Sequence, residues 1–282
     1  RRLIETIIRG RAACPASFIR SLQEYIAVGS TRTGKSGKKL LVAIFWLVIW
    51  EMSSRLAGLP FLLPDPLSTL KKMTELWGYS SFWLSLSGSL FRVMIGFLLA
   101  AVTGTSLAVL CACFRAADEL LSPIKTVVRS TPISSFIILV LLWLSASTAP
   151  VFIGFLAVMP MIWQDVQQGI EQTPAELLEM GRAYKFSRQK TILNIYVPSV
   201  LPYLYTACAN GIGFAWKACI AAEVIARPLN SVGKNLQDAK VYLLTEDLFA
   251  WTVTVIMLSM ALEAGIKRLI RLRGASSGGE RI

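Results

Sequence analysis

Long apolar segments alternate with shorter polar ones along most of this chain. A membrane-spanning helix needs about 20 predominantly apolar residues. The apolar segments run from about residue 40 to 57, 83 to 114, 133 to 144, 149 to 170, 198 to 224 and 248 to 270. This pattern predicts an all-α, polytopic membrane protein with about six transmembrane helices.

The third apolar segment is interrupted. Residues 120–144 read LLSPIKTVVRSTPISSFIILVLLWL, with Pro123 and Pro132 on either side of Arg129. Only about Ile133 to Leu144 is purely apolar, which is too short to span a bilayer unaided. Interrupted helices occur in membranes where they line a buried or water-filled cavity. We therefore expect a polar turn at 115–119, then a broken helix beside a cavity.

The remaining connections differ in character. Residues 58–82 begin rich in proline and then become amphipathic, which predicts a short helix on the membrane surface. Residues 225–249 are expected to form a polar loop. In the second apolar segment Gly88, Gly96 and Gly104 are spaced eight residues apart, a spacing that lets helices approach closely.

Composition and charge placement agree with a membrane protein. Hydrophobic residues make up 54% and charged residues 16%, against roughly 25% charged in average globular chains. The net charge is +12, but 21 Lys and Arg lie on the side of the termini and only five lie in the opposite loops. The positive-inside rule places both termini in the cytoplasm. The basic charge is thus a topology signal, and no nucleic-acid partner is expected.

Other chemistry is weakly supported. The five cysteines form no CxxC pair and the chain has no histidine, so neither a disulfide framework nor a metal site is indicated. Residues 29–36, GSTRTGKS, match the phosphate-binding loop formally. That loop needs a preceding strand in an α/β domain, whereas here an apolar segment begins about four residues later. A flexible basic linker is the simpler interpretation, and no catalytic residue is assigned.

One polar stretch lies between two apolar segments. Residues 173–202 read TPAELLEMGRAYKFSRQKTILNIYVPSVLP, with charged residues at helical spacing and an apolar side opposite them. Pro174 suits a first helical turn, and Pro198 precedes the fifth apolar segment. The pattern predicts an amphipathic helix over about 174–185, a turn, and a membrane helix started by proline. From pattern alone, a solvated loop is equally consistent. If this helix lies in the cytoplasm, a soluble protein that supplies energy could bind to it.

These residues resemble the permease subunits of bacterial ATP-binding-cassette (ABC) importers. The family's cytoplasmic loop reads roughly E-A-A, three residues, G, nine residues, I-x-L-P. With its glutamate on Glu179, Ile195, Val197 and Pro198 fall in register, while Met180 and Gly181 replace the alanines and Lys185 the glycine. Five further blocks are similar to the nitrate, sulfonate, taurine and thiamine-precursor branch: LLPDPLSTL, SLFRVMIGF, VRSTPI, YVPSVLPYL and FAWKACIAAEVI.

The resemblance implies a type I ABC importer permease fold in the bacterial inner membrane, working as a homodimer. The implied partners are two ABC ATPases, which bind the ATP–Mg, an extracellular or periplasmic solute-binding protein, and membrane lipid. The chain itself would bind no cofactor and hydrolyse no ATP. The coupling helix would contact the ATPase through Leu178, Glu179, Met180, Gly181, Arg182, Tyr184 and Lys185, and Ile195 and Pro198 would follow it.

Four residues within or beside the spans are candidates for the solute path: Arg92, Trp216, Lys217 and Glu223. An anionic or heterocyclic solute would bind to the positively charged side chain of Arg92 or Lys217. A structural ion pair between Arg92 and Glu223 is an equally good interpretation, because unpaired charges inside a membrane are costly. The expected domains are a basic tail (1–39), a transmembrane domain (40–272) and a second tail (273–282).

Two other functions are open from the residues alone. A secondary transporter driven by an ion gradient would need paired repeats with matching broken helices, and only one broken helix is evident. A membrane-embedded enzyme would need a nucleophile motif or clustered intramembrane carboxylates, which are not evident either.

Overall fold

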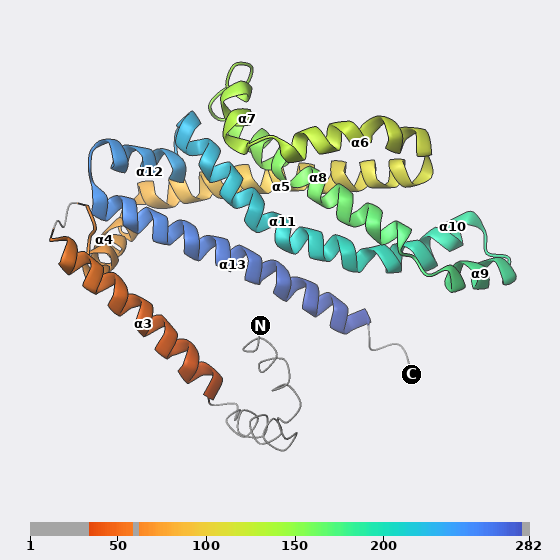
Figure 1. Cartoon of the computed structure of the whole chain (residues 1–282), viewed down its shortest axis with the longest axis horizontal. Helices are drawn as coiled ribbons and strands as arrows, with labels where there is room; N and C mark the ends of the chain where they lie inside the picture. Colours follow the sequence, from red (N-terminus) through yellow and green to blue (C-terminus); the bar gives the residue numbers. More distant parts are fainter. Residues whose placement is uncertain (1–33, 59–61, 278–282) are drawn as a thin grey trace, which may run out of the picture. The chain divides into compact units, whose positions relative to one another are not determined.

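The computed structural model describes residues 34–58 and 62–277, and each regular element in those ranges is helical (Figure 1). The chain divides into two units, residues 1–66 and 67–282, which are described separately. The predicted basic tail up to residue 33 and the GSTRTGKS stretch lie largely outside the described residues.

The first unit consists of α3 (Gly34–Ala57) and the segment after it. Trp50 Nε1 donates to the carbonyl oxygen of Pro64 at 3.1 Å, and Ser54 Oγ to that of Leu63 at 2.7 Å. These bonds fold the following residues back against the end of the helix. Apolar side chains from Leu41 to Ile49 are exposed, as in a helix that buries its surface elsewhere.

The second unit contains the remaining elements. They are α4 (Pro66–Trp77), α5 (Ser80–Cys113), α6 (Arg115–Ser130), α7 (Ile133–Val140), α8 (Ala149–Glu171), α9 (Ala175–Ala183), α10 (Arg188–Thr191), the π-helical turn η2 (Ile192–Tyr196), α11 (Val197–Ala226), α12 (Val232–Val241) and α13 (Thr245–Ser277).

Four described helical segments are long and apolar enough to cross a membrane: α5, α8, the run from Arg188 to Ala226, and residues 245–268 of α13. A fifth is obtained if the bent pair α6 and α7 forms one span. These coincide with the second to sixth segments predicted from the sequence. The first predicted segment is helical as α3, which is not among these candidates, so its crossing of the membrane stays a prediction.

The core of the second unit lies between α5, α8 and α11. Its largest buried side chains include Phe82 and Val93 of α5, Ile162 and Trp163 of α8, and Trp216 of α11. The glycines predicted to allow close approach do so. A Cβ on Gly96 would lie 2.6 Å from the carbonyl oxygen of Val151, and one on Gly104 2.8 Å from that of Met159. The backbones of α5 and α8 therefore touch directly.

The predicted amphipathic helix before the second span is α4. Its Thr69 and Met73 are buried while Leu67 and Leu70 are exposed. Lys72 lies 3.6 Å from both Glu75 and Asp247, the latter on α13. Partial burial of Lys72 lowers its pKa, but the two carboxylates together outweigh this and raise the pKa above its usual value. The ammonium group therefore stays charged at neutral pH.

Several local predictions were wrong. Residues 115–119 are not a turn but the start of α6, because only Phe114 interrupts the helix after α5. Pro123 lies inside α6 without ending it. The predicted break instead falls at Thr131 and Pro132, where the chain bends by 100° into α7.

The predicted loop at 225–249 contains α12. Ser231 begins this helix as its N-cap, and its hydroxyl accepts a hydrogen bond from the N–H of Lys234 at 3.2 Å.

α11 begins at Val197 with Pro198 in its first turn, as the sequence predicts, but the helical run begins earlier, at Arg188. The π-helical turn η2 just before α11 explains how the proline fits. In this turn the N–H of Val197 bonds to the carbonyl oxygen of Ile192, five residues back. The wider turn accommodates a residue that has no N–H to donate.

Candidate functional site

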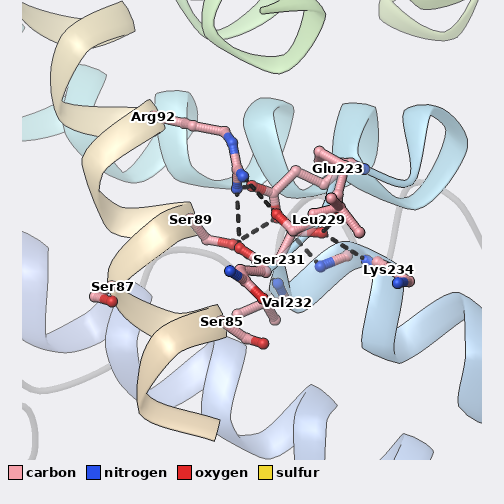
Figure 2. A network of polar contacts seen from close by, with 12 residues as sticks. Ser85, Ser87, Ser89, Arg92, Glu223, Leu229, Ser231, Val232 and Lys234 are labelled. Atoms are coloured by element: carbon pink, nitrogen blue, oxygen red, sulfur yellow. Dashed lines mark hydrogen bonds and ion pairs between the residues drawn. The ribbon is translucent and has the colours of Figure 1, made fainter. Parts of the chain in front are cut away.

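A buried polar network joins α5 to the start of α12 (Figure 2). Glu223 of α11 is fully buried and forms an ion pair with Arg92, whose Nη1 lies 2.9 Å from Oε1. The hydroxyl of Ser89 donates to Oε2 at 2.6 Å, and the N–H of Gly233 donates to the same oxygen at 3.2 Å. Both carboxylate oxygens of Glu223 are thus occupied by groups of the chain itself.

The same network holds the link between α11 and α12. Arg92 also donates to the carbonyl oxygens of Leu229 at 2.8 Å and Asn230 at 3.3 Å. Ser89 accepts a hydrogen bond from the N–H of Val232 at 2.9 Å. Of the two alternatives that the sequence left open for Arg92 and Glu223, this geometry favours the structural ion pair over a direct contact with solute.

The other two candidates for the solute path, Trp216 and Lys217, differ in burial. Trp216 is fully buried, and its Nε1 donates to the carbonyl oxygen of Val255 at 3.1 Å, so it ties α11 to α13. Lys217 is exposed, as is Phe214 one turn earlier on α11. Within residues 34–58 and 62–277 no ion pair involves Lys217. Among the four candidates for the solute path, Lys217 is therefore the one whose charge has no counter-charge in the described residues.

A cleft opens where α6 bends into α7, as the broken helix predicts. It has a volume of about 380 Å³ and is formed by α6, α7, α8 and α11. Its polar lining residues are Arg129, Thr131, Gln164 and Asp165, and Arg129 Nη1 donates to Gln164 Oε1. Sequence reasoning had not assigned these residues to the path. The signal was present, because Arg129 lies between the two prolines of the broken helix.

The predicted coupling helix is α9, slightly shorter than the range 174–185. Pro174 is its N-cap instead of a first-turn residue. Glu179, Arg182, Tyr184 and Lys185 are exposed, Met180 is 42% exposed, and Leu178 is half-buried.

Gly181 faces inward from α9. A Cβ there would lie 3.0 Å from Ile195 Cδ1 of η2, and Ile195 is buried. α9 is thus packed directly on the helix that continues into α11.

Lys185 ends this helix in a left-handed conformation, with φ 51°. Glycine adopts such a conformation without strain. The importer loop that this stretch resembles has glycine at the same position, so the backbone supports the alignment of the motif. The residues that the structure describes contain no group of His, Cys, Asp or Glu side chains able to hold a metal ion.

These features define a class of protein. Several apolar helices, a broken helix with a polar cleft, and an exposed amphipathic helix between two spans are typical of the membrane subunit of a transporter. The chain belongs to the family of binding-protein-dependent transport system inner membrane components, which it matches over residues 93–266. It is therefore a permease subunit of an ABC importer, a component that lacks its own ATPase site.

Several characterised relatives share this assignment. The chain is 30% identical over 206 residues to the bicarbonate transport system permease protein CmpB of Synechocystis sp. (69% of this chain, 73% of that one). It is 29% identical over 205 residues to the nitrate import permease protein NrtB of Synechococcus elongatus (69% and 73%). With the taurine transport system permease protein TauC of Escherichia coli it shares 23% over 236 residues (82% and 86%).

A solved structure shows the same fold. The crystal structure of an amino acid ABC transporter with histidines matches with a TM-score of 0.51 at 17% identity, covering 67% of this chain and 92% of that one. The likeness supports the all-α importer fold expected from the sequence. Family membership does not favour the alternative of a secondary transporter.

Proposed function

We propose that this permease forms, with a second copy of itself, the path for a small solute of the kind its relatives carry. Those relatives are transporters for bicarbonate, nitrate, taurine and aliphatic sulfonates. Two ATPase subunits holding ATP–Mg would supply the energy, and a solute-binding protein would deliver the solute from outside. Both termini would lie in the cytoplasm of a bacterial cell, and the chain would cross the inner membrane several times.

The observation that carries this proposal is the packing of α9. Its outward side presents exposed charged and apolar groups, while Gly181 packs against Ile195. A displacement of α9 by an ATPase would therefore act on η2 and then on α11. Alternating access needs such a connection between the motor and the helices of the path.

The test is co-purification of the permease with its ATPase. The double variant Glu179→Lys, Met180→Arg reverses a charge and places a second one on the exposed side of α9. We expect at least about tenfold less bound ATPase, which corresponds to about 1.4 kcal/mol. Solute-stimulated ATP hydrolysis should fall in parallel.

The matched control is Lys240→Glu, Val241→Arg on the exposed side of α12, which is predicted to lie outside the membrane. It makes the same kind of change at a site that the ATPase cannot reach. If both double variants keep their ATPase equally well, α9 is not the docking helix. Equal loss in both would indicate a general folding defect and would also contradict the proposal.

A further inference from the structure

The cleft at the α6–α7 bend is lined by two side chains of opposite charge. Arg129 lies in the last turn of α6, and Asp165 lies on α8. The two side chains interact electrostatically, but among the described residues neither forms an ion pair within 4.0 Å. The hydrogen bond from Arg129 to Gln164 holds the guanidinium group against α8, the helix that carries Asp165.

The location of these charges is unusual for a membrane helix. Asp165 lies six residues before the end of α8, or about 9 Å along the helix. Charged groups within membrane-spanning helices are rare and almost always face a protein interior or a water-filled cavity. Phe214, Pro160 and Met161 complete the wall of the same cleft. The site therefore combines an apolar surface with one cation and one anion.

We propose that this cleft binds a small zwitterion, with the acidic group of the solute against Arg129 and its amino group against Asp165. This rests on the proposed function, because it assigns the cleft to the solute path. The volume of about 380 Å³ lies in the range of small-molecule sites. The bend between α6 and α7 also leaves backbone groups at both helix ends free of helical partners, which suits a polar solute.

The carboxylate of Asp165 is the reason for preferring a zwitterionic solute to a simple anion. Nitrate or bicarbonate would gain from Arg129 but would be repelled by Asp165 in the same cleft. A zwitterion such as taurine gains from both side chains. Lys217 is not among the residues that line the cleft.

The test places a cysteine at Thr131, which lines the cleft, in a permease whose five cysteines are replaced by alanine or serine. The purified complex with its ATPase is treated with an anionic and a cationic methanethiosulfonate reagent. Both should modify the cysteine. Asp165→Asn should favour the anionic reagent, and Arg129→Gln the cationic one, each by about threefold or more because one unit charge is removed nearby.

Protection by solute then identifies the ligand class. Taurine should slow modification of the Thr131→Cys variant more than nitrate does at equal ionic strength. Asp165→Asn should abolish that difference. Leu98→Cys, on the exposed apolar side of α5, is the control and should react slowly and without protection.

Each other outcome overturns the inference. An unreactive cysteine at 131 means that the cleft is not open to water. Equal protection by nitrate and taurine, or none by taurine, means that it does not select a zwitterion. Labelling of the cleft does not require the ATPase to respond, so failure of the α9 test leaves these results interpretable on their own.

Discussion

At the scale of single residues, the molecule uses its buried charges for structure and leaves other charges free. Glu223 accepts three hydrogen bonds from Ser89, Arg92 and Gly233, and such full satisfaction is what makes a buried carboxylate tolerable. The sequence suggested the pairing of Arg92 with Glu223 because unpaired charges inside a membrane are costly. The roles of Ser89 and Gly233 could not be predicted, because they depend on how α12 returns to α5.

Replacing Glu223 by Gln should destabilise the protein by about 3 kcal/mol, since it leaves the Arg92 charge without a counter-charge. Thermal unfolding in detergent measures the effect. The double variant Arg92→Gln, Glu223→Gln should lose clearly less stability than the two single variants lose when their losses are added. Strict additivity would show that the ion pair contributes nothing to folding.

At the scale of helices, backbone contact decides the packing. Gly88, Gly96 and Gly104 are spaced eight residues apart along α5, and each meets a carbonyl oxygen of another segment. This contact was predictable from the spacing alone. The helix α12 and the turn η2 were not, because α12 has a weak apolar pattern and a π-helical turn has no reliable sequence signal other than the proline after it.

Replacing Gly96 by Ala should cost about 1–3 kcal/mol, because its Cβ would meet the carbonyl oxygen of Val151 and force the helices apart. Gly265→Ala in α13 is the control, since no atom lies within 4 Å of a Cβ at that position. It should be neutral or gain up to about 1 kcal/mol from reduced chain entropy. Comparable melting temperatures for both variants would refute direct contact between α5 and α8.

At the scale of the whole molecule, the arrangement in the membrane follows from charge. The 21 basic residues on the side of the termini against five opposite them predict that α9 is cytoplasmic and α12 extracellular. The order of the membrane-spanning segments could be predicted from hydropathy, because each span needs about 20 predominantly apolar residues. The cleft could be predicted only in outline, since its walls combine the consecutive helices α6, α7 and α8 with the more distant α11.

Labelling in intact cells checks this topology. In the cysteine-free permease, Lys240→Cys on α12 should react with a membrane-impermeant maleimide. Gln189→Cys on α10 should react only after the cells are opened. Labelling of position 189 in intact cells would reverse the assignment and exclude α9 from contact with a cytoplasmic ATPase.

The direct contact of α5 with α8 also constrains how this protein can move. Two backbones that touch at Gly96 and Gly104 cannot turn against each other without driving side chains into carbonyl groups. We therefore expect the pair to behave as one rigid lever. The joints on which it swings are then the places where helical hydrogen bonding is interrupted or altered, the bend at Thr131 and Pro132 and the wide turn before Pro198.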